Sequence, residues 1–232
     1  MWRSVPWGTA LLLLVGSLLA GRVLAANEGQ PDLDRATEAK LNARTFSDLG
    51  EVIRLCESAL AKGLDKDNTP LAKELLVSTL IERAKVTTRR VMGGLLSDPK
   101  WAEYRRFALQ DLEKASKLNP DQPEVLYLMA QLNLLPGGDQ KQAAKALDDA
   151  IRLSPKNPML RAQALTLRAD LQQSPEKKMA DLSEAIRIAP SSINALRERA
   201  SLYAEQNKLD QALKDYQALI ELDPGRASTY EE

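Results

Sequence analysis

Four prolines that recur at nearly constant spacing constrain this 232-residue chain more than any other feature. They are Pro120, Pro155, Pro190 and Pro224. Their period of roughly 35 residues is in the range of internal repeats. Each proline follows a segment with a large residue eight positions before it, and the first three segments have an alanine five positions before it. Proline cannot donate a backbone hydrogen bond and disfavours helical backbone in the preceding residue. The pattern therefore predicts a row of similar helical units, each ending at its proline.

The last of these units shows the most complete pattern of small and large residues. Its members are Leu196, Ala200, Tyr203, Ala212, Tyr216 and Pro224. This spacing resembles that of the tetratricopeptide repeat, a helix–turn–helix unit of about 34 residues. The resemblance implies an all-α fold, a right-handed superhelical solenoid of helix–turn–helix hairpins, in which each hairpin packs only on its neighbours.

The resemblance also implies a division of the chain. It assigns three tetratricopeptide units to residues 123–224, divergent helical hairpins of degenerate tetratricopeptide type to 33–122, and the start of a truncated further repeat to 225–232. A solenoid normally ends in a polar capping helix, and the sequence shows none after Pro224. Three explanations are open: the sequence is part of a longer chain, a partner or a second copy covers the uncapped C-terminal hairpin, or this hairpin tolerates exposure.

Helical periodicity predicts four helices in the first half of the chain. They are expected at residues 33–43, 47–62, 71–92 and 99–118. Ser47 has the side chain of an N-cap residue, Gly63 ends the second helix, and Gly93 with Gly94 ends the third. The chain also lacks the period-two alternation of a strand, so almost no sheet is expected.

The N-terminal residues have the pattern of an export signal. Arg3 supplies a positive start, an apolar run covers residues 10–20, and small residues precede a cut after Ala25. The sequence therefore predicts a signal peptide at 1–25, a flexible lead-in at 26–32, and a periplasmic or secreted protein. An uncleaved signal that anchors the chain in a membrane is the alternative.

Composition excludes several classes of chemistry. The chain has no histidine, which rules out Ser-His and Cys-His nucleophiles and histidine metal sites. Its single cysteine, Cys56, lies on an apolar helix face, where a buried role is expected and an interchain disulfide is the alternative. Lys and Arg together balance Asp and Glu at 32 each, which argues against nucleic acid as a partner. We expect no catalytic, cofactor or metal site; Asp65, Asp67 and Asn68 form only part of a calcium-loop pattern.

Partner-binding residues follow from the resemblance, because arrays of this family bind peptides on the concave surface formed by the first helices. The expected groove residues are Tyr127, Gln131, Gln163, Asn194, Arg197 and Ser201. At the positions of the family's carboxylate clamp, where Lys and Asn are expected, this sequence has Tyr127, Gln131, Gln163, Leu167, Arg197 and Ser201, so the clamp is not carried over. A basic patch for an anionic partner is expected from the charges of residues 82–106, at Arg89, Arg90, Arg105 and Arg106.

These features favour a non-catalytic scaffold or adaptor that binds protein or peptide partners. Two alternatives remain open at the level of sequence. The chain could be the docking or regulatory part of a longer exported enzyme, or it could be a structural envelope or assembly protein.

Overall fold

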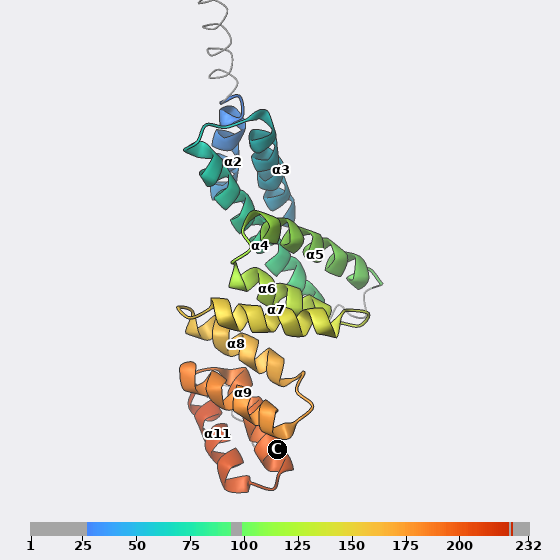
Figure 1. Cartoon of the computed structure of the whole chain (residues 1–232), viewed down its shortest axis with the longest axis vertical. Coiled ribbons are helices and arrows are strands. Elements are labelled where there is room, and N and C mark those ends of the chain that lie inside the picture. Colours follow the sequence, from blue (N-terminus) through green and yellow to red (C-terminus); the bar gives the residue numbers. More distant parts are fainter. Residues whose placement is uncertain (1–26, 94–98, 223, 225–232) are drawn as a thin grey trace, which may run out of the picture. The chain divides into compact units, whose positions relative to one another are not determined.

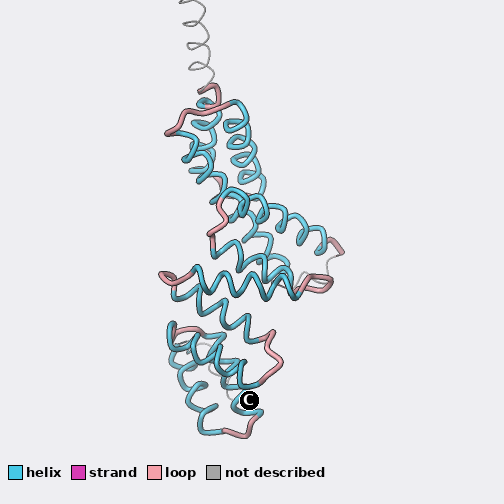
Figure 2. Tube along the Cα trace, viewed as in Figure 1, coloured by secondary structure: helices cyan, strands magenta, loops and turns pink. Residues whose placement is uncertain are grey.

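The structure is a computed structural model that describes residues 27–93, 99–222 and 224. Within these ranges its regular structure is helical and no strand occurs (Figures 1 and 2). The helices are α2 (Gln30–Asn42), α3 (Phe46–Lys62), α4 (Asn68–Met92), α5 (Trp101–Leu118), α6 (Pro123–Asn133), α7 (Gln140–Leu153), α8 (Pro158–Ala169), α9 (Pro175–Ile188), α10 (Ile193–Glu205) and α11 (Leu209–Leu222). The expected signal peptide and the expected further repeat at 225–232 lie outside the described residues.

The chain divides into two compact units, residues 1–119 and 120–232. In the first unit α2 pairs with α3 and α4 pairs with α5, so two helical hairpins are present. In the second unit the pairs are α6 with α7, α8 with α9, and α10 with α11. The expected all-α fold of stacked helical hairpins is confirmed. In the part of the chain that is described, no helix is long and apolar enough to span a bilayer.

Helix α2 begins earlier than expected. It starts at Gln30 rather than Leu33, so residues 30–32 are helical and the expectation of a flexible lead-in is wrong for them. Pro31 suits the first turn of a helix. The buried carboxylate of Asp32 accepts hydrogen bonds from Ser58 Oγ and Lys62 Nζ of α3, each at 2.6 Å. These bonds hold the start of α2 on α3. They also lower the pKa of Asp32, and the bond from Lys62 is the main cause.

Helix α3 has a different N-cap from the one expected at Ser47. Thr45 Oγ1 accepts a hydrogen bond from the backbone N–H of Asp48, and the Asp48 carboxylate accepts one from the backbone N–H of Thr45. This reciprocal pair is a capping box, which satisfies two backbone donors at once. The helix ends at Gly63, whose φ of 96° favours glycine, and that expected end is confirmed.

The second unit buries small and large apolar residues at repeated positions. Ala130, Ala169 and Ala200 of the first helices are fully buried, as are Leu147 and Leu182 of the second helices. One core cluster joins α7 to α6 and α8, and another joins α8, α9 and α10. Each hairpin therefore packs on the next, which is the arrangement that the repeat pattern predicts.

An ion pair between a partly buried arginine and a buried aspartate recurs in three of the hairpins. An arginine comes immediately before the buried alanine of the first helix. An aspartate lies nine positions before the proline that ends the second helix. The pairs are Arg83–Asp111, Arg168–Asp181 and Arg199–Asp215, with N···O distances of 2.6–2.8 Å. The α6–α7 hairpin has Met129 and Ala146 at the same positions. Both partners change together, so neither position leaves an unpaired charge in that hairpin.

Candidate functional site

The six expected groove residues all lie on first helices of the second unit. Tyr127 and Gln131 are on α6, Gln163 is on α8, and Asn194, Arg197 and Ser201 are on α10. Helix α8 contacts both α6 and α10, so the three helices are neighbours. The residues thus lie along one succession of adjacent helices.

Two hydrogen bonds join pairs of these residues, each pair within one helix. Gln131 Nε2 donates to Tyr127 Oη at 3.1 Å on α6, and Arg197 Nη1 donates to Asn194 Oδ1 at 3.2 Å on α10. Tyr127 is half-buried, and burial raises the pKa of its hydroxyl. Gln163 is exposed on the helix between these two pairs. Most of the groups offered are neutral amides and hydroxyls, which can both donate and accept hydrogen bonds.

A cleft lies next to α10. Ser201 lines it and is an expected groove residue, but the sequence did not predict the other lining residues. It has a volume of about 260 Å³, and its walls are Gln172, Gln173, Pro175, Lys178, Glu198, Ser201, Leu202 and Glu205. Burial raises the pKa of Glu198 to about 7, and the nearby carboxylate of Asp170 adds to the rise. Lys178 Nζ lies 3.5 Å from Asp170 Oδ1 and offsets part of that negative charge. Spacing within one repeat could not reveal this carboxyl pair, because Asp170 and Glu198 come from different hairpins.

The first unit has a corresponding groove between α2 and α4, with a volume of about 490 Å³. Gln30, Leu33 and Thr37 line it. They lie six and three positions before and one position after the buried Ala36. Asn194, Arg197 and Ser201 have the same offsets from Ala200. Leu71 is exposed at its edge. Extending the repeat register from the second unit to the first would have found these residues.

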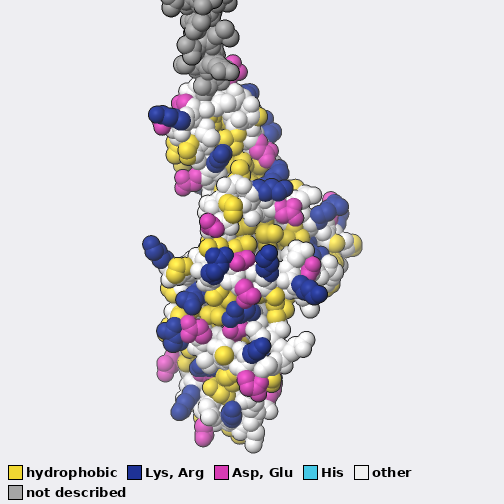
Figure 3. Space-filling view, viewed as in Figure 1, with side chains coloured by type: hydrophobic (Ala, Val, Ile, Leu, Met, Phe, Trp, Pro, Cys, Tyr) yellow, Lys and Arg dark blue, Asp and Glu magenta, His cyan; other side chains and the backbone are white. Residues whose placement is uncertain are grey.

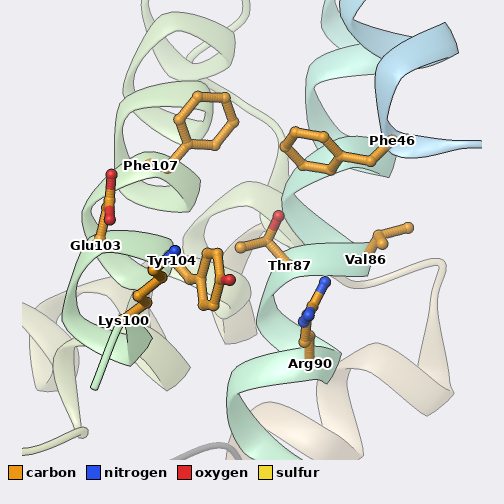
Figure 4. Close-up of a pocket in the computed structure, with 8 residues that line it drawn as sticks. All are labelled: Phe46, Val86, Thr87, Arg90, Lys100, Glu103, Tyr104 and Phe107. Carbon is orange, nitrogen blue, oxygen red and sulfur yellow. The ribbon is translucent and has the colours of Figure 1, made fainter. Parts of the chain in front are cut away.

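The four arginines of the expected basic patch have different surroundings. Arg90 lines a cleft of the first unit and lies over the ring of Tyr104, with 5.2 Å between the guanidinium carbon and the ring centroid (Figure 4). Arg89 and Arg106 are exposed and Arg105 is half-buried, and none of the three lines that cleft. The structure thus places one member of the patch beside an apolar wall, and binding of an anionic partner by the four stays a prediction.

The surroundings of Cys56 and Asp65 indicate structural roles for both residues. Cys56 is fully buried in α3, and burial is the main reason that the pKa of its thiol rises to about 11. Asp65 accepts hydrogen bonds from the backbone N–H groups of Asp67 and Asn68 and from Asn68 Nδ2, so both of its carboxylate oxygens bind within the turn before α4. Among the described residues, no group of three or more metal-ligating side chains is found.

The charged surface of the second unit is mixed. On the face shown in Figure 3, Lys and Arg side chains are interspersed with Asp and Glu side chains. Two ion pairs of the second unit lie along one helix, Arg187 with Glu184 and Arg152 with Asp149. Exposed pairs of this kind contribute little to stability, about 0–1 kcal/mol each.

Comparison with known proteins supports the repeat assignment in two segments. Family models described as "Tetratricopeptide repeat" match residues 124–157 and 193–226. The interferon-induced protein with tetratricopeptide repeats 2 of Cricetulus griseus is 31% identical over 122 residues, which are 51% of this chain and 25% of that protein. The chain therefore spans only part of the length of this curated relative. Two segments of the second unit thus match the tetratricopeptide repeat.

Solved structures share the fold at low sequence identity. The MamA protein aligns with a TM-score of 0.51 at 18% identity, covering 88% of this chain and 96% of its own. MamA 41-end from Desulfovibrio magneticus RS-1 aligns with a TM-score of 0.54 at 15% identity, covering 87% and 98%. YrrB, described as a tetratricopeptide protein with an unusual peptide-binding site, aligns with a TM-score of 0.54 at 15% identity, covering 85% and 87%. These likenesses show the fold alone.

Proposed function

We propose that this chain is a non-catalytic scaffold that binds an extended peptide segment of a partner protein along α6, α8 and α10. The observation that carries the proposal is the position of Gln131, Gln163 and Asn194 on three adjacent first helices. Amide side chains in such a row can pair with the backbone N–H and C=O groups of an extended peptide, with little demand on its sequence. The peptide-binding site of YrrB supports the same use of a related fold.

The fixed geometry of the hairpins favours this function energetically. Two of the three hairpins of the second unit are held by a buried Arg–Asp pair, and the first helix of each carries groove residues. A surface that is already ordered loses less conformational entropy when it binds. Less of the free energy gained from contacts with the partner is then offset by that entropy loss.

Site-specific photo-crosslinking tests the groove. A photoreactive amino acid at Gln163 in the full chain is expected to crosslink a partner, and the crosslinked peptide is identified by mass spectrometry. The matched control places the same amino acid at Lys145, an exposed residue on the second helix α7. The identified peptide is then synthesised and titrated against the wild type and the Q163A/N194A double variant. Equal affinity of the two proteins would overturn the proposal.

We infer that residues 1–25 direct export and that the working protein is periplasmic or secreted. The positive start, the apolar run and the small residues before Ala26 support this inference. The intact mass of the protein recovered from its native host shows whether residues 1–25 have been removed, and a chain that begins at Ala26 is expected. A chain that keeps residues 1–25 and is found in the membrane fraction would instead support the anchored alternative.

Self-assembly is a second candidate function, and one feature of α11 favours it. Leu209 and Leu213 are exposed there, and they continue the helical stripe of the half-buried Tyr216 and Ile220. An apolar stripe of this kind on a solenoid is a surface on which a further helix can pack. A second copy of the chain could supply that helix.

A further inference from the structure

A cleft in the first unit combines aromatic walls with a cationic edge. Its volume is about 320 Å³, and it lies between the start of α3, the second half of α4 and the start of α5 (Figure 4). Its lining residues are Phe46, Val86, Thr87, Arg90, Lys100, Glu103, Tyr104 and Phe107. In Figure 4 the rings of Phe46 and Phe107 face each other from α3 and α5. Phe46 is 44% exposed and Val86 39% exposed, so solvent reaches the apolar wall.

The apolar wall of the cleft is held in place by an arginine. The rings of Phe46 and Phe107 are 5.5 Å apart between centroids and tilted by 48°. The guanidinium of Arg83 lies over both, 5.5 Å from the Phe46 centroid and 4.7 Å from that of Phe107. Arg83 is itself held by two hydrogen bonds to Asp111, at 2.7 and 2.8 Å. A cation in this position attracts the faces of both rings and keeps the wall ordered.

The charges around the cleft are mainly positive. Arg90 and Lys100 line it against one carboxylate, that of Glu103. Residues 82–106 contain seven Lys or Arg and three Asp or Glu. A ligand that complements this site therefore has an apolar part for the aromatic wall and a negative group for the edge beside Arg90. The volume is at the small end for ligand sites, which suits one or two side chains rather than a long segment.

We propose that this cleft binds a partner peptide through one large apolar side chain placed next to a carboxylate. The apolar side chain packs between Phe46, Val86 and Phe107. The carboxylate accepts a charge-assisted hydrogen bond from Arg90, beside Tyr104. The site lies in the first unit and is independent of the groove on α6, α8 and α10. A peptide is favoured over a nucleic acid because the Glu103 carboxylate at the edge opposes a run of phosphates.

Calorimetric titration of the full chain with three short capped peptides tests this proposal. The peptides are identical except for a central pair, which is Phe-Asp, Phe-Asn or Ala-Asp. The Phe-Asp peptide is expected to bind most tightly, because it alone meets both requirements. R90M should weaken its binding roughly ten-fold and leave the Phe-Asn peptide unaffected, since a hydrogen bond to a charged group is lost. R89M removes a neighbouring exposed charge outside the cleft and should leave all affinities unchanged.

A second variant keeps the test independent of Arg90. V86E puts a carboxylate at an exposed position of the wall, so it should abolish binding of the Phe-Asp peptide while thermal unfolding confirms that the protein is folded. Equal affinities for Phe-Asp and Phe-Asn, equal losses in R89M and R90M, or no binding of any peptide would overturn the proposal. Tighter binding of a single-stranded oligonucleotide that R90M abolishes would overturn it in favour of nucleic acid. The Q163A/N194A variant should bind the Phe-Asp peptide like the wild type, so this test and that of the α6–α8–α10 groove fail separately.

Discussion

Arg199 of α10 binds Asp215 of α11 through two parallel hydrogen bonds, Nε to Oδ2 and Nη2 to Oδ1, each of 2.8 Å. Asp215 is buried and Arg199 is mostly so. The Arg199 guanidinium also reaches back to Ser183 of α9 at 3.4 Å, and the equivalent Arg168 reaches back to Asp148 of α7 at 2.7 Å. Each arginine therefore joins its own hairpin and contacts the one before it, which makes the ion pair a central element of the stack.

Breaking this pair from one side should be costly, whereas replacing both partners should not. D215A leaves a buried guanidinium without its anion and is expected to lower the free energy of unfolding by about 3–5 kcal/mol. The double variant R199M/D215A should recover most of that loss, because Met129 and Ala146 occupy the same positions in the α6–α7 hairpin. Urea unfolding followed by circular dichroism measures both. A double variant as unstable as D215A would contradict this account.

The stability of the second unit should rise as the pH falls from 8 to 5. The folded state raises the pKa of Glu198 from 4.5 to about 7, so the folded protein binds the proton more tightly than the unfolded chain. The stabilisation is present at low pH and is lost as the pH rises through 7, by at most about 1.4 kcal/mol per pH unit. The groups that face Glu198 are Asp170, Lys178 and Arg197, and no histidine titrates in this range.

Thermal unfolding between pH 5 and 8 measures this dependence. E198Q carries no ionisable group at the position, so its unfolding temperature should vary less with pH and should exceed that of the wild type at pH 8. The matched control is E205Q, which changes an exposed residue of the same cleft. A wild type and an E198Q variant with the same pH profile would argue against a protonated Glu198.

Gly29 should not tolerate a side chain. A Cβ atom built there would lie 2.0 Å from the backbone oxygen of Ala59, while the Gly29 N–H donates to Gly63 O at 2.9 Å. The start of α2 must move away from α3 to admit it, so we expect G29A to lose about 1–3 kcal/mol of unfolding free energy. G50A is the control, because its Cβ would approach only the Arg83 Nη1 atom, at 3.3 Å, and alanine favours a helix. Chemical denaturation ranks the two, and an equal loss in both would contradict the packing argument.

The Cys56 thiol should react slowly while the protein is folded. Its pKa rises from the ordinary value of 9.0 to about 11, so roughly a hundred-fold less thiolate is present at neutral pH, and burial blocks access as well. Reaction with a chromogenic disulfide reagent, with and without denaturant, measures the difference. Rapid reaction of the native protein would show that α3 opens easily and would revive the interchain disulfide.

The stripe on α11 predicts a concentration-dependent association. L213E puts a charge in the middle of the stripe at an exposed position, so it should shift the protein toward monomer with little effect on its thermal stability. K214E changes the adjacent exposed residue and serves as the control. Sedimentation velocity over a range of concentrations separates the species. A wild type that stays monomeric at every concentration would count against self-assembly.

The repeat and most helix positions could be read from the sequence, because both depend on local spacing. The expected helices ending at Gly63 and Gly93 agree with the structure, and Gly94 lies outside the described residues. The N-cap of α3 could not be placed by residue type alone, because Thr45 and Ser47 have equally suitable hydroxyls. Only the pairing with Asp48 distinguishes them.

The ion pairs and clefts escaped the sequence analysis for a different reason. A charged residue in a helical pattern is usually solvated, so Arg168 and Asp181 carry no local sign of burial. Their constant positions relative to the buried alanine and the closing proline would have revealed the pair, since the spacing repeats in three hairpins. The Phe46–Phe107 wall and the Asp170–Glu198 pair depend on contacts between hairpins, which the spacing within one unit does not specify.

The absence of an Arg–Asp pair from the positions of Met129 and Ala146 bears on the order in which the hairpins can complete their contacts during synthesis. When α8 leaves the ribosome, α7 has already been made and α9 has not. Asp148 of α7 can then bind Arg168, but the two-bond pairing of Arg168 with Asp181 needs α9. The α6–α7 hairpin has apolar side chains at the equivalent positions, so it can pack as soon as its own two helices have been made.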